Sequence, residues 1–229
     1  MSTDPAGGAP SLPRPFPDAD AIRGDRVDLE RLDPARHGPE LWRAIGDPGL
    51  WAGVPPGPFP DEAAFVDWLR LRIGQSGTVL HAIMDKSGGT ARAAGLFLLL
   101  QVNAAMGVAE LGLVYGPALS RRAGGTEAFL LQGRYLFETL GYRRLEWRCT
   151  PENKASMRAA ARYGFTLEGV LRQTMWVKGG NWDTAVHAIL DREWPAVAAR
   201  LEAWLAPGNF APDGTRIRPL ADFLRQGPA

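Results

Sequence analysis

The residues best suited to chemistry stand in the segment Ser120–Thr126, which reads Ser-Arg-Arg-Ala-Gly-Gly-Thr. A phosphate is held well by several backbone N–H groups at close range and by nearby fixed positive charge. The two glycines of this segment allow close approach of the backbone, the two arginines bring charge, and Thr126 can cap a following helix or offer its hydroxyl to an anion. The segment predicts an anion-binding loop, although a tight turn with two solvated arginines would have the same composition.

Two strand-and-helix units would position this loop. The strand Leu111–Tyr115 precedes it, and a segment with helical character, Glu127–Leu140, follows it. A second strand, Arg144–Cys149, leads to Asn153, which opens a short helix that ends near Gly164. The backbone N–H groups at each helix start would point toward an anion. The sequence therefore predicts two helix N-termini beside neighbouring strands.

The remaining chain alternates strand and helix patterns, which predicts an α/β (mixed α+β) domain. Its expected architecture is a central mixed, mostly antiparallel sheet flanked by helices. Further strands are expected over Arg26–Leu32, Val79–Asp85, Ala93–Val102, Val108–Tyr115, Leu171–Val177 and Thr184–Leu190, and further helices over Pro34–Ile45, Asp61–Ile73 and Trp194–Trp204.

The two ends of the chain differ in composition from the middle. Residues 1–21 hold five prolines and little apolar surface, so a disordered leader is expected there. Residues 22–205 form the expected folded domain. Residues 206–229 carry scattered apolar side chains and are expected to pack on the body or on a partner subunit.

Composition narrows the classes of function. Lys plus Arg number 26 against 25 Asp plus Glu, so bulk charge gives no argument for nucleic-acid binding. No apolar run is long enough to span a bilayer, and no secretory signal is apparent, so no membrane association is expected. The single cysteine, Cys149, suits a reducing cytoplasm and is expected to be a buried structural thiol. Three separated histidines offer no metal ligand set, so no metal is expected.

Several motifs in a fixed order carry a family resemblance. Together they closely resemble the GNAT superfamily of acyl-CoA-dependent N-acetyltransferases, and within it the RimJ/RimL type. The resemblance covers about residues 22–205 and implies a sheet splayed at the cofactor strand. The motifs are Arg121–Ala128, Tyr135–Glu146, Asn153–Ser156, Tyr163–Phe165 and Glu168–Arg172.

The resemblance implies acetyl-CoA as co-substrate and assigns residues to it. The loop would hold the pyrophosphate, and the splayed strand Leu111–Tyr115 would pair through its backbone with the pantetheine arm. From the residues alone, Asn153 could equally be only an N-cap and Ser156 an exposed first-turn residue. The implied cofactor-binding residues are Leu113, Val114, Tyr115, Arg121, Arg122, Ala123, Gly124, Gly125, Thr126, Asn153 and Ser156.

Four positions depart from the family pattern. Ser120 and Ala123 stand where the loop usually has Gln or Arg and Gly, which bears on cofactor affinity. Ala160 stands where many members have a tyrosine that protonates the leaving thiolate, so the resemblance leaves Ser156 as the candidate hydrogen-bond donor to that sulfur. Met175 replaces a glutamate that has been given the role of base in RimL-like members.

Glu110, at the start of the cofactor strand, is the remaining candidate general base, acting directly or through water. The expected catalytic residues are thus Glu110 and Ser156. The expected reaction is direct attack of a neutral primary amine on the thioester, without a covalent enzyme intermediate. Weak base machinery favours a peptide N-terminus or a small-molecule amine over lysine, because an α-amino group has a pKa of about 7.7–8 and lysine about 10.4.

The acceptor side is less defined by sequence. Trp51 is a candidate pocket wall, although aromatic side chains more often only pack. Asp183 is a candidate contact to the acceptor amine, with capping of a turn as the alternative. A homodimer is expected only from the frequency of twofold dimers among soluble oligomers.

Two other functions remain open from the sequence. Met175 and Ala160 allow an acyl-CoA-binding sensor or scaffold that has lost turnover. A nucleotide-binding domain is the weaker alternative, because the chain lacks both Gly-Lys-Ser/Thr and the dinucleotide fingerprint.

Overall fold

The computed structural model describes residues 11–211 and 215–224, and its centre is one eight-stranded sheet. The strand order is β1-β2-β3-β4-β5-β6-β8-β7, and neighbours are antiparallel except for the parallel pair β5 and β6. This is the mixed, mostly antiparallel sheet expected from the sequence. The strands are β1 (Ala21–Arg23), β2 (Val27–Arg31), β3 (Val79–Asp85), β4 (Arg92–Asn103), β5 (Val108–Tyr115), β6 (Arg144–Cys149), β7 (Thr166–Val177) and β8 (Gly180–Leu190).

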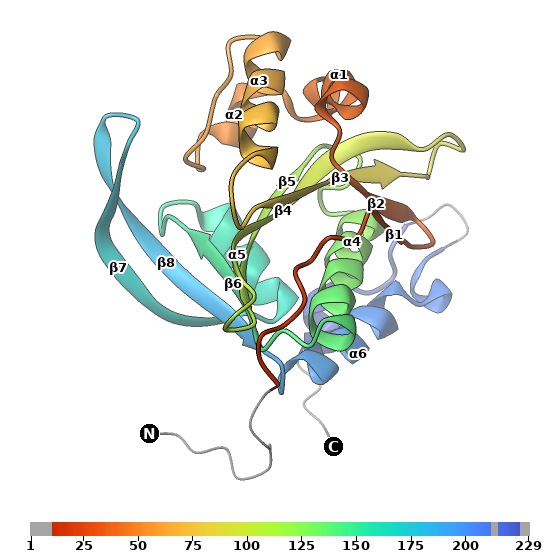
Figure 1. Ribbon diagram of the computed structural model, residues 1–229. Coiled ribbons are helices and arrows are strands. Elements are labelled where there is room, and N and C mark those ends of the chain that lie inside the picture. The colour runs from red at the N-terminus through yellow and green to blue at the C-terminus, as the bar shows by residue number, and fades with distance from the viewer. Residues whose placement is uncertain (1–10, 212–214, 225–229) are drawn as a thin grey trace, which may run out of the picture.

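Helices cover both faces of the sheet (Figure 1). One apolar cluster joins α1, α2 and α3 to one face, and a larger cluster joins α4, α5, α6 and α7 to the other. The helices are α1 (Pro34–Ile45), α2 (Pro48–Trp51), α3 (Glu62–Ile73), α4 (Ala123–Arg134), α5 (Lys154–Tyr163), α6 (Trp194–Leu205) and α7 (Leu220–Leu224), with a π-helical turn η1 (Tyr135–Thr139) and a 3₁₀ turn η2 (Pro207–Asn209).

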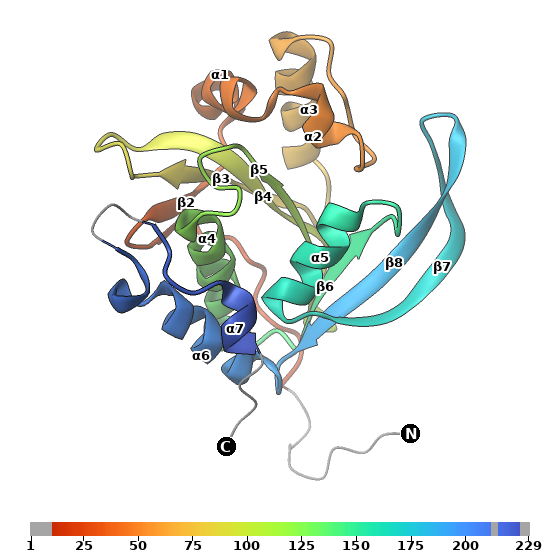
Figure 2. The same cartoon turned by 180° about the vertical axis from the view of Figure 1, so that it is seen from behind.

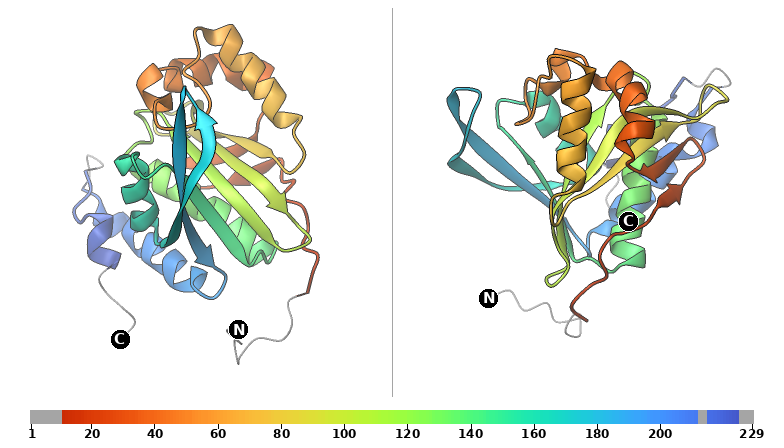
Figure 3. Two further views of the ribbon diagram at one scale, coloured as in Figure 1. Left: turned by 90° about the vertical axis from the view of Figure 1, so that its left-hand side faces the viewer. Right: turned by 45° about the horizontal axis from the view of Figure 1, so that its top comes forward.

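The sheet splays open between its two parallel strands. β5 and β6 pair only from Val108–Leu111 against Arg144–Trp147. Beyond that point β5 stays paired with β4 through Tyr115, while β6 stays paired with β8 through Cys149. Figure 1 and the right-hand view of Figure 3 show the two halves of the sheet diverging from this junction. The exposed edge of β5 therefore presents alternate backbone groups to the gap.

Local sequence signals explain the helix ends around the gap. Asp61 caps α3 by accepting from Ala64 N at 2.8 Å, and Asn153 caps α5 by accepting from Ser156 N at 3.0 Å. Gly164 ends α5 in the left-handed region, with φ of 94°. These caps were expected from the residue types, since Asp and Asn side chains satisfy first-turn N–H groups and glycine adopts positive φ at low cost.

The last two strands form a projecting arm. β7 begins at Thr166, five residues earlier than expected, and β8 begins at Gly180, four residues earlier. Register shifts occur between Leu167 and Gly169 and between Leu171 and Met175. They interrupt the alternation of apolar and polar residues, so the sequence pattern does not indicate where the strand begins. Figure 3 shows this arm from its side. The arm forms one wall of the gap.

The two ends of the described chain lie on the body. Residues 1–10 of the expected leader lie outside the described residues, and for residues 11–21 the structure differs from the expectation of disorder. Arg14 N donates to Ala104 O at 2.8 Å, Ala19 N donates to the Tyr135 hydroxyl at 3.1 Å, and Ala21 opens β1. In the tail, Leu220 is buried and Trp204 Nε1 donates to Arg218 O at 3.0 Å. Figure 2 shows α7 beside α5 and α6.

Candidate active site

Two cavities meet at the splay of the sheet. A cleft of about 1210 Å³ lies on the side of α5 and the C-terminal segment, and a pocket of about 390 Å³ lies on the side of α2 and α3. Eight residues line both cavities: Gly53, Val54, Leu113, Val114, Trp147, Thr150, Ser156 and Trp182. A ligand in the cleft can therefore reach a ligand in the pocket through the opening between β5 and β6.

Positive charge dominates the cleft. Its lining holds five cationic side chains against a single carboxylate, Glu152. α5 carries three of the five on one face because they recur every fourth residue. The cationic residues are Arg121, Lys154, Arg158, Arg162 and Arg216. Such a lining suits a ligand with several phosphates.

Part of the expected phosphate loop is helical in the structure. α4 begins at Ala123, so Gly124, Gly125 and Thr126 belong to its first turn and are buried. A Cβ on Gly125 would lie 2.6 Å from Leu119 O, so this glycine permits close packing of the helix against the preceding turn. The sequence predicted that this Gly-Gly pair allows unusual backbone angles and close contact, and the structure places both glycines in a helical first turn where the close contact is with the protein itself.

Among the loop residues only Arg121 and Ser120 line the cleft. Arg122 is exposed but outside the lining, and it is the N-cap of α4 without a side-chain hydrogen bond to the helix. Thr126, only 1% exposed, does not cap the helix as expected. The first-turn N–H groups of α4 thus have no side-chain cap, which leaves the helix N-terminus suited to an anion.

Ser156 is held at the junction of the two cavities. Its Oγ accepts a hydrogen bond from Trp147 Nε1 at 2.9 Å, and its N–H donates to Asn153 Oδ1 at 3.0 Å. Asn153 Nδ2 in turn donates to Gly53 O at 3.1 Å. Because the indole N–H occupies one lone pair of Oγ, the Ser156 hydroxyl keeps its own proton to donate, and the Cys149 thiol lies within its hydrogen-bonding reach. Asn153 is therefore both an N-cap and a wall of the cleft.

Glu110 lies in the pocket and shares its face of the sheet with Glu146, its partner in the parallel register. Burial raises the pKa of Glu110, against the opposing charge of Arg148. Burial would also raise the pKa of Glu146, but hydrogen bonds from Arg144 and Arg148, at 2.7 and 2.8 Å, hold that pKa below its usual value. The pKa values of these two adjacent glutamates are thus shifted in opposite directions. Glu110, whose pKa is raised, is the one with the properties of a base.

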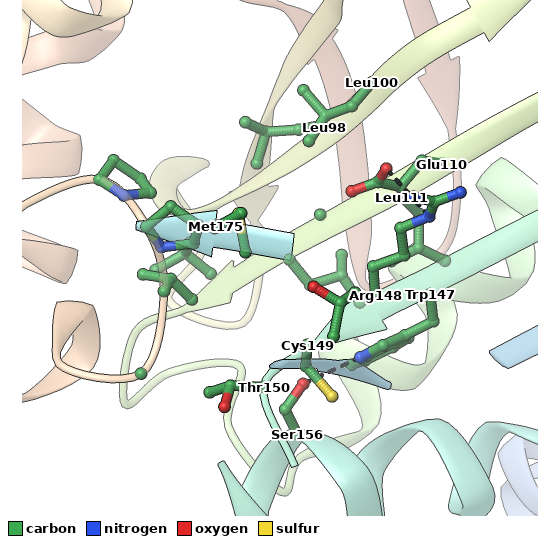
Figure 4. A pocket seen from close by; sticks show the side chains of 18 of the residues that line it. Leu98, Leu100, Glu110, Leu111, Trp147, Arg148, Cys149, Thr150, Ser156 and Met175 are labelled. Atoms are coloured by element: carbon green, nitrogen blue, oxygen red, sulfur yellow. Dashed lines mark hydrogen bonds and ion pairs between the residues drawn. The ribbon is translucent and has the colours of Figure 1, made fainter. Parts of the chain in front are cut away.

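Figure 4 places Glu110 and Ser156 toward opposite ends of the pocket, with Trp147 and Arg148 between them. Glu110 Oε2 accepts from Gln101 Nε2 at 3.1 Å and lies 3.6 Å from Arg148 Nε. Its side chain is 14% exposed. Glu110 is therefore a candidate proton acceptor at the end of the pocket remote from Ser156.

The remaining predicted residues divide between the cavities and the core. Leu113, Val114 and Tyr115 line the cleft, whereas Asp183 lines neither cavity and instead accepts from Gln173 N at 2.8 Å on β7. Trp51 borders the pocket but is 1% exposed, and its Nε1 donates to Ile45 O at 2.6 Å. Packing is thus the main visible role of Trp51.

Cys149 differs from the expected buried structural thiol because it lies at the site. It is half-buried, lines the pocket, and lies beside Ser156 (Figure 4). Its Sγ is 3.5 Å from Met157 Sδ. Burial raises the pKa of this thiol, which disfavours the reactive thiolate.

Sequence reasoning missed the cationic residues outside the loop. Lys154, Arg158 and Arg162 stand four residues apart in a predicted helix, and that spacing alone could have marked a basic face. Arg216 could not be found this way, because the C-terminal segment reaches the cleft only through its packing. Asn209 fixes it there: its Oδ1 accepts from Arg218 N at 2.9 Å, and its Nδ2 donates to Trp204 O at 2.9 Å.

The described part of the chain holds neither a candidate membrane span nor a candidate metal cluster. No helix within residues 11–211 and 215–224 is long and apolar enough to cross a membrane. In the same residues, no three His, Cys, Asp or Glu side chains are grouped so that they could hold a metal ion.

Known proteins resemble both the sequence and the fold. A family model described as an acetyltransferase (GNAT) domain matches residues 26–166. The crystal structure of a GCN5-related N-acetyltransferase from Brucella melitensis is 40% identical, with a TM-score of 0.87, over 92% of this chain and 96% of that one. A probable GNAT-family acetyltransferase from Chromobacterium violaceum is 43% identical, with a TM-score of 0.76, over 85% of this chain and 100% of that one.

A curated relative matches over a shorter stretch. The uncharacterized N-acetyltransferase YoaA of Bacillus subtilis (strain 168) is 35% identical over 82 residues, which are 36% of this chain and 46% of that protein. The match thus spans less than half of the relative. The family model alone covers more than half of this chain, and the splayed sheet is the architecture that the motifs implied. The chain belongs to the GNAT acetyltransferase family.

Proposed function

We propose that this protein transfers an acetyl group from acetyl-CoA to a primary amine. The observation that carries the proposal is the junction at Ser156, where a large cationic cleft opens into a smaller pocket that holds a carboxylate of raised pKa. Membership of the GNAT family supports acetyl-CoA as the donor. The RimJ/RimL type and the cytoplasmic location remain predictions.

The described residues fit CoA at three levels. The uncapped N-terminus of α4, together with Arg121, suits a pyrophosphate, and the basic face of α5 suits a further phosphate. The free edge of β5 beyond Leu111 suits an amide-containing arm, because unpaired strand groups form hydrogen bonds with an added extended chain. The cleft volume of about 1210 Å³ accommodates a ligand larger than a simple nucleotide.

When bound, acetyl-CoA would supply an activated acetyl group as its thioester. Ser156 would donate its hydroxyl proton to the departing sulfur, since its oxygen is already oriented by Trp147. Glu110 would accept the proton of the acceptor amine as the C–N bond forms and the C–S bond breaks. No covalent enzyme intermediate is needed. Cys149, whose thiol pKa is raised by burial, is not proposed as a nucleophile.

The base machinery favours an acceptor that loses its proton easily. The pocket holds a single carboxylate, Glu110, among the described residues. An α-amino group with a pKa of about 7.7–8 is partly neutral at pH 7, whereas a lysine amine near 10.4 is not. A peptide N-terminus or a small molecule with an α-amino group is therefore the proposed acceptor, in preference to a lysine side chain.

Calorimetric titration tests the donor half of the proposal. Acetyl-CoA and desulfo-CoA are each titrated into the protein, with ATP as the control for a general nucleotide site. The expected result is saturable one-site binding of acetyl-CoA and none of ATP. Absence of acetyl-CoA binding would overturn the proposal.

Thiol release tests the transfer half. Free CoA is measured with a thiol reagent after α-amino amides are added to the acetyl-CoA complex, and the expected result is amine-dependent release. Binding of acetyl-CoA without release by any amine would favour the alternative of an acyl-CoA-binding sensor.

A further inference from the structure

The acceptor pocket has an unusually aromatic and apolar wall. Four tryptophans, one each from α2, α3, β6 and β8, line it together with aliphatic side chains, of which Figure 4 labels Leu98, Leu100 and Leu111. Its volume of about 390 Å³ falls in the range of small-molecule pockets. The apolar lining residues are Trp51, Val54, Pro55, Pro56, Trp68, Leu98, Leu100, Leu111, Leu113, Val114, Trp147, Leu171, Met175 and Trp182.

The charges in this pocket are few and are already partnered. Its lining holds two arginines, Arg72 and Arg148, against the single carboxylate of Glu110. Glu110 Oε2 already accepts from Gln101 and lies 3.6 Å from Arg148. The described lining therefore offers no second carboxylate to neutralise an additional ammonium group.

A further positive charge, Lys178, lies beside the pocket without being one of its lining residues. Lys178, at the tip of the arm, donates from Nζ to Val54 O at 2.8 Å and also to Trp51 O. The same ammonium lies 5.7 Å from the ring centre of Trp182, a pocket residue. The arm tip is thus fastened to the segment after α2, and it places a cation close to the aromatic wall.

We infer that the acceptor is a primary amine that carries one bulky apolar or aromatic group and no second positive charge. This inference rests on the proposed function and names the substrate class of the same site. Desolvating a second ammonium among Arg72, Arg148 and Lys178 is unfavourable without a carboxylate, whereas an apolar group gains free energy by leaving water. The pocket therefore selects against polyamines and lysine-like chains.

A matched pair of small amines tests the inference. L-Norleucinamide and L-lysinamide share an α-amino group and a four-carbon side chain, and lysinamide adds a terminal ammonium. Each is titrated into the CoA-bound protein, and binding is followed by tryptophan fluorescence, since four tryptophans line the pocket. We expect norleucinamide, and with it phenylalaninamide, to bind at least about tenfold more tightly than lysinamide. Equal affinities, or tighter binding of lysinamide, would overturn the inference.

A charge reversal identifies the source of the selectivity. Arg72→Glu adds a carboxylate to the pocket and is expected to reduce the norleucinamide-to-lysinamide ratio by about fivefold or more. Arg70→Glu, on the same helix, is the control: the Arg70 side chain is 59% exposed, pairs with Asp67 and lies outside the pocket lining. An unchanged ratio in a folded Arg72→Glu protein that still binds acetyl-CoA would count against the charge argument.

Turnover is read separately from amine binding. If norleucinamide binds selectively but CoA is not released, the acceptor class stands and the proposed transfer fails. If CoA is released equally well by both amides, the transfer stands and the acceptor class is wrong.

Discussion

The cleft and the pocket have linings of different chemical character, although the two cavities share one opening. The cleft lies against an uncapped helix terminus, a free strand edge and five cationic side chains, which are features of backbone and charge. The pocket lies against tryptophans and aliphatic side chains around one carboxylate, which are features of shape and burial. Backbone features persist through many substitutions, whereas a side-chain wall changes with each one. Family membership therefore indicates the donor and not the acceptor.

Glu110→Gln should give the largest loss of activity. Its effect should be confined to the pocket and should not reach the cleft. We expect kcat to fall about 10²–10⁴-fold, the usual contribution of a general base. The Kd for acetyl-CoA should change by less than about twofold, because Glu110 lines the pocket and not the cleft. Steady-state kinetics and calorimetry check the two halves. A full kcat with acceptors of high amine pKa would exclude Glu110 as the base.

Ser156→Ala should break the junction that both cavities share. Loss of a hydrogen bond to a charged sulfur costs about 1.5–3 kcal/mol, so kcat should fall about tenfold or more while the KM for the amine changes little. Trp147 Nε1 would also lose its acceptor at 2.9 Å, so a melting curve is needed to confirm folding. If kcat is unchanged in the folded variant, the leaving group finds its proton elsewhere.

Gly125→Ala tests whether the glycines beside the cleft pack the helix or cradle the cofactor. A Cβ at this position would lie 2.6 Å from Leu119 O, so we expect the free energy of unfolding to fall by about 1–3 kcal/mol. Gly88→Ala is the control, because no atom lies within 4 Å of its added Cβ. Urea denaturation measures both. Lost acetyl-CoA binding at unchanged stability would instead support a direct contact with the cofactor.

Arg158→Ala should weaken the cleft alone. A single exposed charge contributes little, so we expect the Kd for acetyl-CoA to rise about two- to fivefold at low salt and less at high salt. Arg192→Ala removes an exposed arginine that lines neither cavity and should leave the Kd unchanged. Calorimetry at two salt concentrations measures the Kd of each variant. An equal effect of both variants would show only a loss of bulk charge.

The smallest expected effect is on the pH dependence of stability, and it differs between the two neighbouring glutamates. The folded protein raises the pKa of Glu110, so folding binds its proton more tightly, and the stability contribution of Glu110 falls as pH rises above the ordinary value of 4.5. The pKa of Glu146 is lowered, so its contribution is present above 4.5 and is lost as pH falls. Relative to the native protein, Glu110→Gln should gain stability as pH rises, and Glu146→Gln should lose it.

Urea denaturation at a series of pH values measures both differences. Parallel pH profiles for the two variants would show that the environments of the two glutamates do not differ.

The sequence by itself determined the framework of this protein. Asp61, Asn153 and Gly164 marked helix ends because capping depends on a few adjacent atoms. Alternating apolar residues marked the central strands because side chains alternate between the two faces of a strand. The order of motifs indicated the GNAT family and the splayed sheet. These signals are local in sequence, or they recur in a fixed order along it.

Tertiary structure decided what depends on contacts between distant segments. Gly125 is a packing residue because Leu119 O lies against it, which its neighbours in sequence do not reveal. Arg216 reaches the cleft because Asn209 holds the C-terminal segment in place. Glu110 and Glu146 differ in pKa because the arginines around them come from folding, not from residue type. Burial and electrostatic environment sum contributions from the whole chain, so only the folded arrangement fixes them.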